Sequence, residues 1–181
     1  QRVLKTTEQL NSKSTVVLGH DKEGVLKHLQ NIKGSIFTVI QVNQLGTADA
    51  VKSAMPNTKR DETILVLYGD VPLVSARSLQ ELIDQAAGGF SILTTHLDNP
   101  FGYGRVIIDA NNSATAIVEE KDATDDQKLV KEIFTGILCI NQELLATGLE
   151  EISNDNAAQE FYLTCVLYTS PSPRDPIGSG L

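Results

Sequence analysis

Residues 64–72 of this 181-residue chain read ILVLYGDVP, and this stretch decides the fold. A continuous apolar run of this kind is typical of a strand buried inside a parallel sheet. The run ends at Gly69-Asp70, and Pro72 stops the strand. Because ligands of open α/β sheets bind beyond the carboxyl ends of the strands, we expect Asp70 to lie where one carboxylate can hold a divalent cation against substrate phosphates. Gly69 leaves room for a ligand to approach the backbone.

Strands and helices alternate on either side of this run. Residues 14–19 and 36–40 are short apolar segments typical of strands, and each precedes a segment with apolar positions at helical spacing. A further helix, with Leu79, Leu82 and Ala86 in register, follows the run itself. Since strand–helix–strand units cross over with one hand, the pattern predicts an α/β fold with a mixed, mostly parallel sheet.

Polar residues mark the expected helix starts. Asp21 and Thr47 are the predicted N-caps of the first two helices, and Ser75 competes with Ser78 at the third. Pro56 is expected to end the second helix.

The spacing of the apolar segments changes after Ser91. Apolar segments at 92–97, 106–108 and 116–118 are closely spaced, which favours a partly antiparallel addition to the sheet. A polar, helix-like segment follows, and then a last predicted strand at 133–140.

The end of the chain departs from this pattern. Residues 165–181 contain Pro171 and Pro173, which prevent a helix from continuing. The segment resembles a translated sequencing adapter, so we expect a non-native, disordered tail after a folded domain at 1–164. Because the first residue is Gln1, we expect the chain to begin inside a longer protein.

Composition argues against several classes of protein. The net charge of -8 disfavours a nucleic-acid-binding surface, which usually needs a basic patch. Cys139 lies in an apolar run and Cys165 is the only other cysteine, so no disulfide framework is expected and the cytoplasm is favoured. Since no apolar run is long enough to span a bilayer, no membrane partner is expected.

Residues 41–47 (QVNQLGT) follow the second predicted strand and carry two polar features. The carboxamide of Gln41 can offer both a donor and an acceptor to a pyrimidine base or an amide. The Gly46-Thr47 pair opens the next helix and presents backbone N–H groups toward a ligand. The alternative interpretation is a polar loop with an ordinary cap, just as Asp70 can be a loop residue that hydrogen-bonds locally.

Two later segments add candidate residues. Residues 99–105 (NPFGYGR) form a turn before a strand, where Gly104 either admits a ligand to the main chain or serves a hairpin that needs positive φ. Glu119 ends the next strand, where a carboxylate can bind sugar hydroxyls, although a solvated surface charge is the alternative interpretation.

Six short segments occur in a characteristic order between about Val16 and Thr164. They are QVNQLGT (41–47), LYGDVP (67–72), DNPFGYGR (98–105), IVEEKDAT (117–124), TGIL (135–138) and NAAQEFYLT (156–164). Each is weak alone, but together they resemble the uridylyltransferase part of the bacterial bifunctional N-acetylglucosamine-1-phosphate uridyltransferase/glucosamine-1-phosphate N-acetyltransferase family.

The resemblance implies a Rossmann-like nucleotide-diphospho-sugar transferase fold, truncated at both ends, with 1–164 as a partial nucleotidyltransferase domain. It implies no catalytic residue beyond a metal ligand, since the family's arginine and lysine lie upstream of Gln1. The implied site residues are Gln41, Gly46 and Thr47 for the nucleotide, Tyr68, Gly69 and Asp70 for the substrate, Asp70 for Mg²⁺, and Gly104 and Glu119 for N-acetylglucosamine.

The implied reaction transfers a uridylyl group from UTP to N-acetylglucosamine-1-phosphate. Its products are pyrophosphate and UDP-N-acetylglucosamine, a precursor for peptidoglycan and cell-wall synthesis. The resemblance implies a homotrimeric parent protein, whereas the chain alone is expected to be monomeric. Because the family's glycine-rich loop precedes Gln1, the chain alone is also expected to be inactive or nearly so.

The chain departs from the family at a few positions. Phe134 stands where the family usually has an asparagine that touches the substrate, Ala158-Gln159 replaces a Gln-Gly pair, and Cys165 replaces an aspartate. Two alternative functions therefore stay open. One is a sister sugar-phosphate nucleotidyltransferase with another base or sugar, and the other is a non-catalytic nucleotide-sugar-binding module, which Phe134 favours most.

Overall fold

The computed structural model describes residues 2–20, 22–30, 32, 36–87, 89–111 and 113–169. Its strands are β1 (Ser14–Leu18), β2 (Ile36–Ile40), β3 (Thr63–Val66), β4 (Phe90–His96), β5 (Arg105–Ile108), β6 (Ala114–Val118) and β7 (Glu132–Asn141). Its helices are α1 (Arg2–Glu8), α2 (Lys22–Leu29), α3 (Thr47–Ala54), α4 (Ala76–Ala86), α5 (Asp125–Lys128), α6 (Gln142–Glu151) and α7 (Val166–Thr169). Every predicted strand is present, with ends that shift by no more than two residues.

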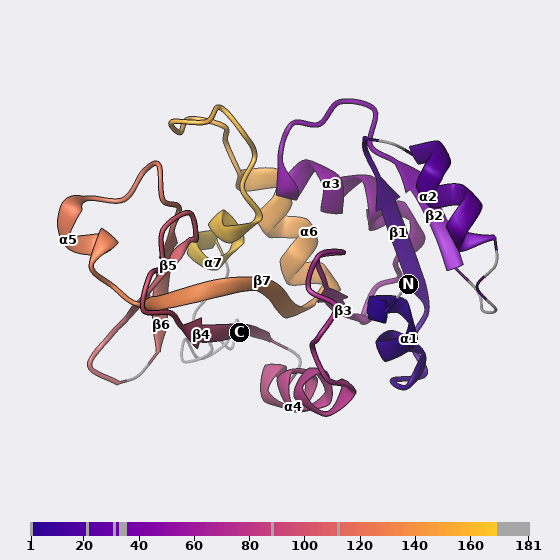
Figure 1. Cartoon of the computed structure of the whole chain (residues 1–181), viewed down its shortest axis with the longest axis horizontal. Coiled ribbons are helices and arrows are strands. Elements are labelled where there is room, and N and C mark those ends of the chain that lie inside the picture. The colour runs from indigo at the N-terminus through magenta and orange to yellow at the C-terminus, as the bar shows by residue number, and fades with distance from the viewer. Residues whose placement is uncertain are drawn as a thin grey trace, which may run out of the picture.

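Strand β7 is the centre of the larger sheet (Figure 1). Ile140 pairs with Ile64 of β3 across one edge and with Phe90 of β4 across the other, and both pairings are antiparallel. Farther toward the start of β7, Ile133 pairs with Arg105 of β5, which in turn pairs with β6. The long apolar run of β7 suits this position because the strand is covered on both faces.

The α/β class with a mixed sheet is confirmed, but the expectation of a mostly parallel sheet is wrong for the described strands. Among them, β1 and β2 form the one parallel pair, and the other pairings are antiparallel. The reason is that β7 lies between β3 and β4. Since both run antiparallel to β7, they run parallel to each other, as the crossover through α4 predicts.

Helices cover both faces of β7, so the molecule has three layers. Leu138 and Ile140 point into one core, where they meet Leu145 and Leu149 of α6. The alternate residues of β7 point into a second core on the other face, against α4. Figure 1 shows α6 and α4 on opposite sides of the strand.

The smaller sheet, β1–β2, lies to one side with α2, and α3 links it to the rest. Ala48 of α3 is 3% exposed and packs in the same core as α6. Because β1 and β2 are parallel and in register, from Ser14 with Ile36 to Leu18 with Ile40, their carboxyl ends meet at one edge. That edge begins the candidate site.

The helix caps are partly as expected. The Ser75 hydroxyl accepts a hydrogen bond from the Ser78 N–H at 3.0 Å, so Ser75 is the N-cap of α4. Asp21 lies outside the described residues. Helices α1 and α6 were not expected from the sequence; the side chain of Asn141 caps α6 by accepting from the Glu143 N–H at 2.9 Å.

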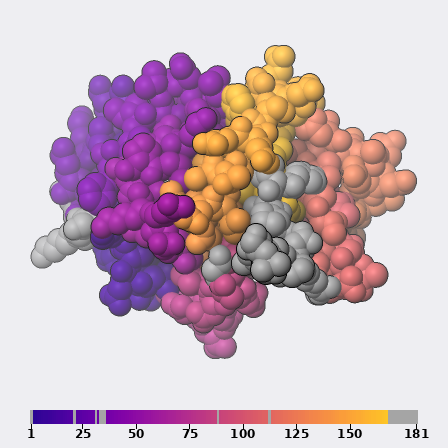
Figure 2. Space-filling view, turned by 180° about the vertical axis from the view of Figure 1, so that it is seen from behind, coloured from indigo at the N-terminus to yellow at the C-terminus, as the bar shows by residue number. Residues whose placement is uncertain are grey.

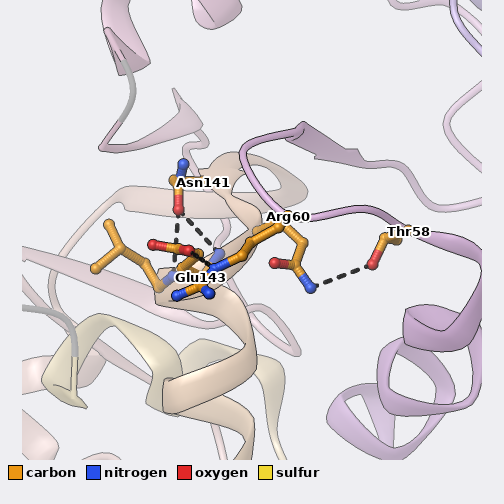
Figure 3. A network of polar contacts seen from close by, with 6 residues as sticks. Thr58, Arg60, Asn141 and Glu143 are labelled. Carbon is orange, nitrogen blue, oxygen red and sulfur yellow. Dashed lines mark hydrogen bonds and ion pairs between the residues drawn. The ribbon is translucent and has the colours of Figure 1, made fainter.

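A polar network ties the segment before β3 to this helix start (Figure 3). Arg60 forms an ion pair with Glu143, and the Gln142 amide donates to the Thr58 hydroxyl at 3.4 Å. The Gln142 N–H also donates to the Glu62 carbonyl at 2.9 Å. Because the ion pair is largely exposed, we expect it to fix geometry more than to add stability.

The C-terminal boundary differs from the expected one at residue 164. Leu163–Cys165 forms a 3-10 turn, Val166–Thr169 forms α7, and Val166 is fully buried in the core beside α6. The packed core therefore continues beyond residue 164, because Val166 is buried in it despite the change in composition. Residues 170–181 of the expected tail lie outside the described residues.

The described C-terminal part of the chain joins the two sides of the molecule. In Figure 2 it lies, orange to yellow, between the purple N-terminal elements and the salmon-coloured part around α5. In the described part of the chain, no helix combines the length and apolar character needed to cross a membrane.

If β7 organises both cores, shortening a side chain there will be costly. Leu138 is 1% exposed, and Leu138→Ala is expected to lower the free energy of unfolding by about 2–5 kcal/mol. Urea denaturation measures this change. Leu73→Ala, at a side chain that is 84% exposed, serves as the control and should change stability by less than about 0.5 kcal/mol. Equal effects of the two substitutions would contradict the assigned core.

Candidate functional site

Two adjoining hollows lie at the edge where β1 and β2 end. Both are lined by Gly19, which follows β1, and by Gln41 and Gln44, which follow β2. The first has a volume of about 410 Å³, and the second has a volume of about 370 Å³. The second also reaches the start of α3; its remaining lining residues are Gly46, Thr47, Ala50 and Glu160. The structure thus places Gln41, Gly46 and Thr47 around one hollow.

A backbone clamp holds the start of α3 against a segment far along the chain. The Phe161 N–H donates to the Leu45 carbonyl, and the Ala48 N–H donates to the Phe161 carbonyl, both at 2.8 Å. Gly46 has φ +123°, and a Cβ there would lie 2.6 Å from the Phe161 carbonyl oxygen. Only glycine fits this position, because both the dihedral and the close approach exclude a side chain.

Thr47 is not the helix N-cap that the sequence predicts. Gly46 occupies the N-cap position without a side-chain cap bond, and Thr47 is the first residue of α3. The Thr47 hydroxyl instead accepts a hydrogen bond from the Leu163 N–H at 2.9 Å. Thr47 therefore bonds to a residue far along the chain instead of capping its own helix.

Tyr68 lies beyond the end of β3 and packs on Gly136 of β7. Gly136 has φ +83°, and a Cβ there would lie 2.6 Å from Cδ2 of the Tyr68 ring. Burial raises the pKa of the Tyr68 hydroxyl; a hydrogen bond with Thr47 opposes this shift, and the nearby charges of Glu119 and Asp70 add to it. The Tyr68 hydroxyl thus bonds to Thr47 and is influenced by the charges of Glu119 and Asp70, so it links predicted residues of separate segments.

Glu119 and Gly104 lie side by side. A Cβ at Gly104 would lie 3.4 Å from Oε2 of Glu119. The Thr164 hydroxyl donates to Oε1 of Glu119 at 3.1 Å. Burial raises the pKa of Glu119; the Thr164 hydrogen bond opposes the shift, and the charges of Asp122 and Glu160 add to it.

Asp70 is exposed in the turn after β3, next to Gly69. A Cβ at Gly69 would meet nothing within 4 Å, so the backbone next to Asp70 faces open space. Within the described residues, no group of three or more His, Cys, Asp or Glu side chains is arranged to hold a metal ion. A lone exposed carboxylate fits Mg²⁺ held jointly with water and substrate phosphates, since this ion needs only one or two protein carboxylates.

Buried Arg105 supports this region, and the sequence reasoning assigned it no role. It is 2% exposed, its guanidinium donates to the Tyr103 carbonyl, and its Nη2 lies 2.6 Å from Oε2 of Glu120. The same carboxylate oxygen accepts the Gly102 N–H at 3.1 Å, and the Arg105 bond is the largest cause of the lowered pKa of Glu120. The pair ties the glycine-rich turn to the end of β6, which positions Gly104 and Glu119.

Other contributors to the site were also missed. Thr164, Gly136 and Gln44 lie within the six segments quoted above, but nothing local signals their contacts with Glu119, Tyr68 and Gly19. Phe134 is 6% exposed and packs in the core, while its N–H donates to the Gly104 carbonyl at 2.9 Å. Its side chain is therefore a core residue in this structure.

The chain is similar in sequence to a known family of transferase domains and to longer bacterial proteins. Residues 1–161 match the family described as "MobA-like NTP transferase domain". The chain is 46% identical over 164 residues to the bifunctional protein GlmU of Neisseria meningitidis serogroup B (strain ATCC BAA-335 / MC58), covering 90% of this chain and 35% of that protein. It is 43% identical over 168 residues to GlmU of Psychrobacter cryohalolentis, covering 91% and 37%. The chain thus spans little more than a third of the length of these relatives.

Solved structures show the same fold at low sequence identity. UDP-glucose pyrophosphorylase complexed with UDP-glucose superposes with a TM-score of 0.68 at 15% identity, covering 93% of this chain and 72% of that one. HddC from Yersinia pseudotuberculosis complexed with GMP-PN superposes with a TM-score of 0.63 at 17% identity, covering 90% and 68%. These similarities confirm the predicted nucleotide-sugar transferase type of fold.

Gly136 and Gly69 offer a matched pair of glycine substitutions. Gly136→Ala is expected to lower the free energy of unfolding by more than about 1 kcal/mol, because alanine must adopt positive φ and displace the Tyr68 ring. Gly69→Ala enters open space and should leave stability nearly unchanged. Urea denaturation of both variants tests this difference. A Gly136→Ala variant as stable as the unmodified protein would refute the packing of Tyr68 on β7.

Glu119 should make stability depend on pH in a defined direction. Since burial raises its pKa above the ordinary 4.5, the folded state holds this proton more tightly than the unfolded state. The stability that Glu119 contributes to the folded state is therefore complete below pH 4.5 and is lost as pH rises through the raised pKa of Glu119. Glu119→Gln stays neutral, so the stability of the unmodified protein minus that of the variant should fall as pH rises from about 4 to 8. A difference that grows with pH would contradict a buried, proton-retaining Glu119.

Proposed function

We propose that this chain, which belongs to the MobA-like NTP transferase domain family, carries the nucleotidyl-transfer site of an enzyme that activates a sugar phosphate. The observation that carries the proposal is that Tyr68 hydrogen-bonds to Thr47, which lines the hollow together with Gln41, while the charges of Asp70 and Glu119 both act on the Tyr68 hydroxyl. The similarity to GlmU proteins over 90% of the chain supports it. The substrates we propose are UTP and N-acetylglucosamine-1-phosphate, as the sequence resemblance implies.

In this proposal the two substrates occupy adjacent parts of one surface. Gln41, Gly46 and Thr47 contact the nucleotide, while Gly104 and Glu119 bind the hydroxyls of the sugar. An oxygen of the sugar phosphate attacks the α-phosphorus of UTP, and pyrophosphate leaves. The reaction needs in-line positioning and stabilisation of negative charge, so no covalent protein nucleophile is required.

Asp70 would hold Mg²⁺ in this site, and Gly69 leaves the space for phosphates beside it. When bound, the ion neutralises charge on the phosphate oxygens and the leaving pyrophosphate. The half-buried Tyr68 packs on Gly136 and so anchors the turn that carries the exposed Asp70 to β7. Arg105 and Glu120 hold the turn that carries Gly104, so the sugar side of the site is shaped before the substrate binds.

We further propose that the whole protein works in the cytoplasm as a trimer and supplies a cell-wall precursor. Two free cysteines, one of them buried, support the reducing compartment. The alternatives stay a sister transferase with another base or sugar, and a module that binds a nucleotide sugar without turnover. The fold does not choose the base, since one structural neighbour is complexed with UDP-glucose and another with GMP-PN.

Pyrophosphate release and product identification test the proposal in the whole protein that carries this chain. UTP with N-acetylglucosamine-1-phosphate is compared with CTP, dTTP and GTP, and with other sugar 1-phosphates. We expect UDP-N-acetylglucosamine as the main product. Faster turnover of another pair would favour the sister transferase, and binding without turnover would favour the non-catalytic module.

Asp70→Asn isolates the role of the carboxylate. We expect kcat to fall by about 100-fold, because an amide binds Mg²⁺ more weakly and roughly 2.7 kcal/mol of charge stabilisation in the transition state is lost. Asp61→Asn is the control: Asp61 is exposed outside the site, and asparagine tolerates its φ of 65°. Pyrophosphate release is measured over a range of Mg²⁺ concentrations. Unchanged kcat in Asp70→Asn at every Mg²⁺ concentration would contradict the proposed metal ligand.

A further inference from the structure

The side-chain amide of Gln41 has both of its hydrogens engaged within the protein. Nε2 donates to the Gly46 carbonyl at 3.2 Å and to Oδ2 of Asp49 at 2.7 Å. A carbonyl and a carboxylate only accept hydrogen bonds, so the nitrogen of the amide, and not its oxygen, must face the start of α3. This corrects the sequence expectation that the Gln41 carboxamide can serve a ligand as both donor and acceptor.

Only Oε1 of this amide is left to meet a ligand, and it can only accept. Gln41 lines both hollows at the ends of β1 and β2, so the amide stands where they adjoin. Asp49 lies in the first turn of α3, which the clamp to Phe161 holds in place. The short bond from Gln41 to a carboxylate is of the charge-assisted kind, which resists rotation of the amide more than a neutral bond does.

The bases of nucleotides differ in what they offer to a fixed acceptor. At the N3 position uracil and thymine carry an N–H donor, whereas N3 of cytosine is itself an acceptor and the donor of cytosine is the neighbouring 4-amino group. Two acceptors placed opposite each other leave both without a partner, and a site built to receive a donor discriminates strongly against a ligand that lacks one. A carboxamide free to rotate would accommodate either base and would not discriminate.

We propose that Asp49 is a positioning residue that locks the Gln41 amide as an acceptor and so makes the site select a pyrimidine with an imide N–H over cytosine. The inference rests on the proposed function, because it specifies the nucleotide of that same site. Asp49 acts through Gln41 and has no contact of its own with the base in this account.

Asp49→Asn is the direct test, because the substitution keeps the size of the side chain and replaces one acceptor oxygen with an N–H donor. The introduced amide can then donate to Oε1 of a rotated Gln41 amide, so only the longer 3.2 Å bond from Nε2 to the Gly46 carbonyl still favours the original orientation. Binding of UTP and of CTP is measured by titration calorimetry in the whole protein that carries this chain. We expect the unmodified protein to bind UTP at least about tenfold more tightly than CTP, and the variant to lose most of that ratio.

The chain offers a matched control on α4. Gln80 Nε2 donates to Oδ1 of Asp84 at 2.9 Å, which is the same carboxamide–carboxylate bond at an exposed position outside the hollows. Asp84→Asn should leave the ratio of the two affinities unchanged. Thermal unfolding of each variant confirms that it folds, and Asp49→Ala, which removes the lock without adding a donor, should also lower the ratio.

The outcomes separate this inference from the function on which it rests. If the unmodified protein prefers UTP and Asp49→Asn keeps the same preference, the lock by Asp49 is refuted while the proposed function stands. Equal affinity of the unmodified protein for UTP and CTP also overturns the inference. If neither nucleotide binds, the proposed function fails, and the inference fails with it.

Discussion

The backbone clamp between residues 45–48 and 161–163 is the constraint on which the site depends. It joins the start of α3 to a segment more than a hundred residues later in the chain, through hydrogen bonds of 2.8–2.9 Å. The same segment delivers Thr164 to Glu119 and buries Leu163 in the core. Because Gly46 has no side chain, the two backbones can approach closely enough to make these bonds. Without the clamp, no hydrogen bonds from the 161–164 segment would hold Gly46 and Thr47 of the nucleotide side in position relative to Glu119 of the sugar side.

Strand β7 gives the clamp a rigid base. It separates two apolar cores, and Gly136 in its middle receives the ring of Tyr68. Strand β7 therefore carries both Leu138, which packs against α6, and Gly136, which receives the Tyr68 ring of the proposed site. A strand that is paired on both edges moves little, which suits a reaction whose rate depends on positioning more than on a chemical group supplied by the protein.

Much of the fold could be predicted, because local patterns carry it. The apolar runs located strands such as β2 to the residue, and the placement of Gln41 and Asp70 at strand ends followed from them. The position of β7 between β3 and β4 could not be predicted, since the choice of strand partner depends on packing between distant segments. Thr47 was misassigned as a cap for the same reason: its partner, the Leu163 N–H, is remote in sequence. The single acceptor role of Gln41 likewise depends on Asp49, which lies in the first turn of a different element.

Hydrogen–deuterium exchange in the whole protein, with and without UTP, Mg²⁺ and N-acetylglucosamine-1-phosphate, tests the central claim most directly. If the clamp unites the nucleotide and sugar sides, ligands should slow exchange together in peptides covering 41–50, 68–71 and 160–165, while α4 keeps its exchange rates. Slowed exchange confined to a region outside these peptides, or none in residues 160–165, would contradict the account.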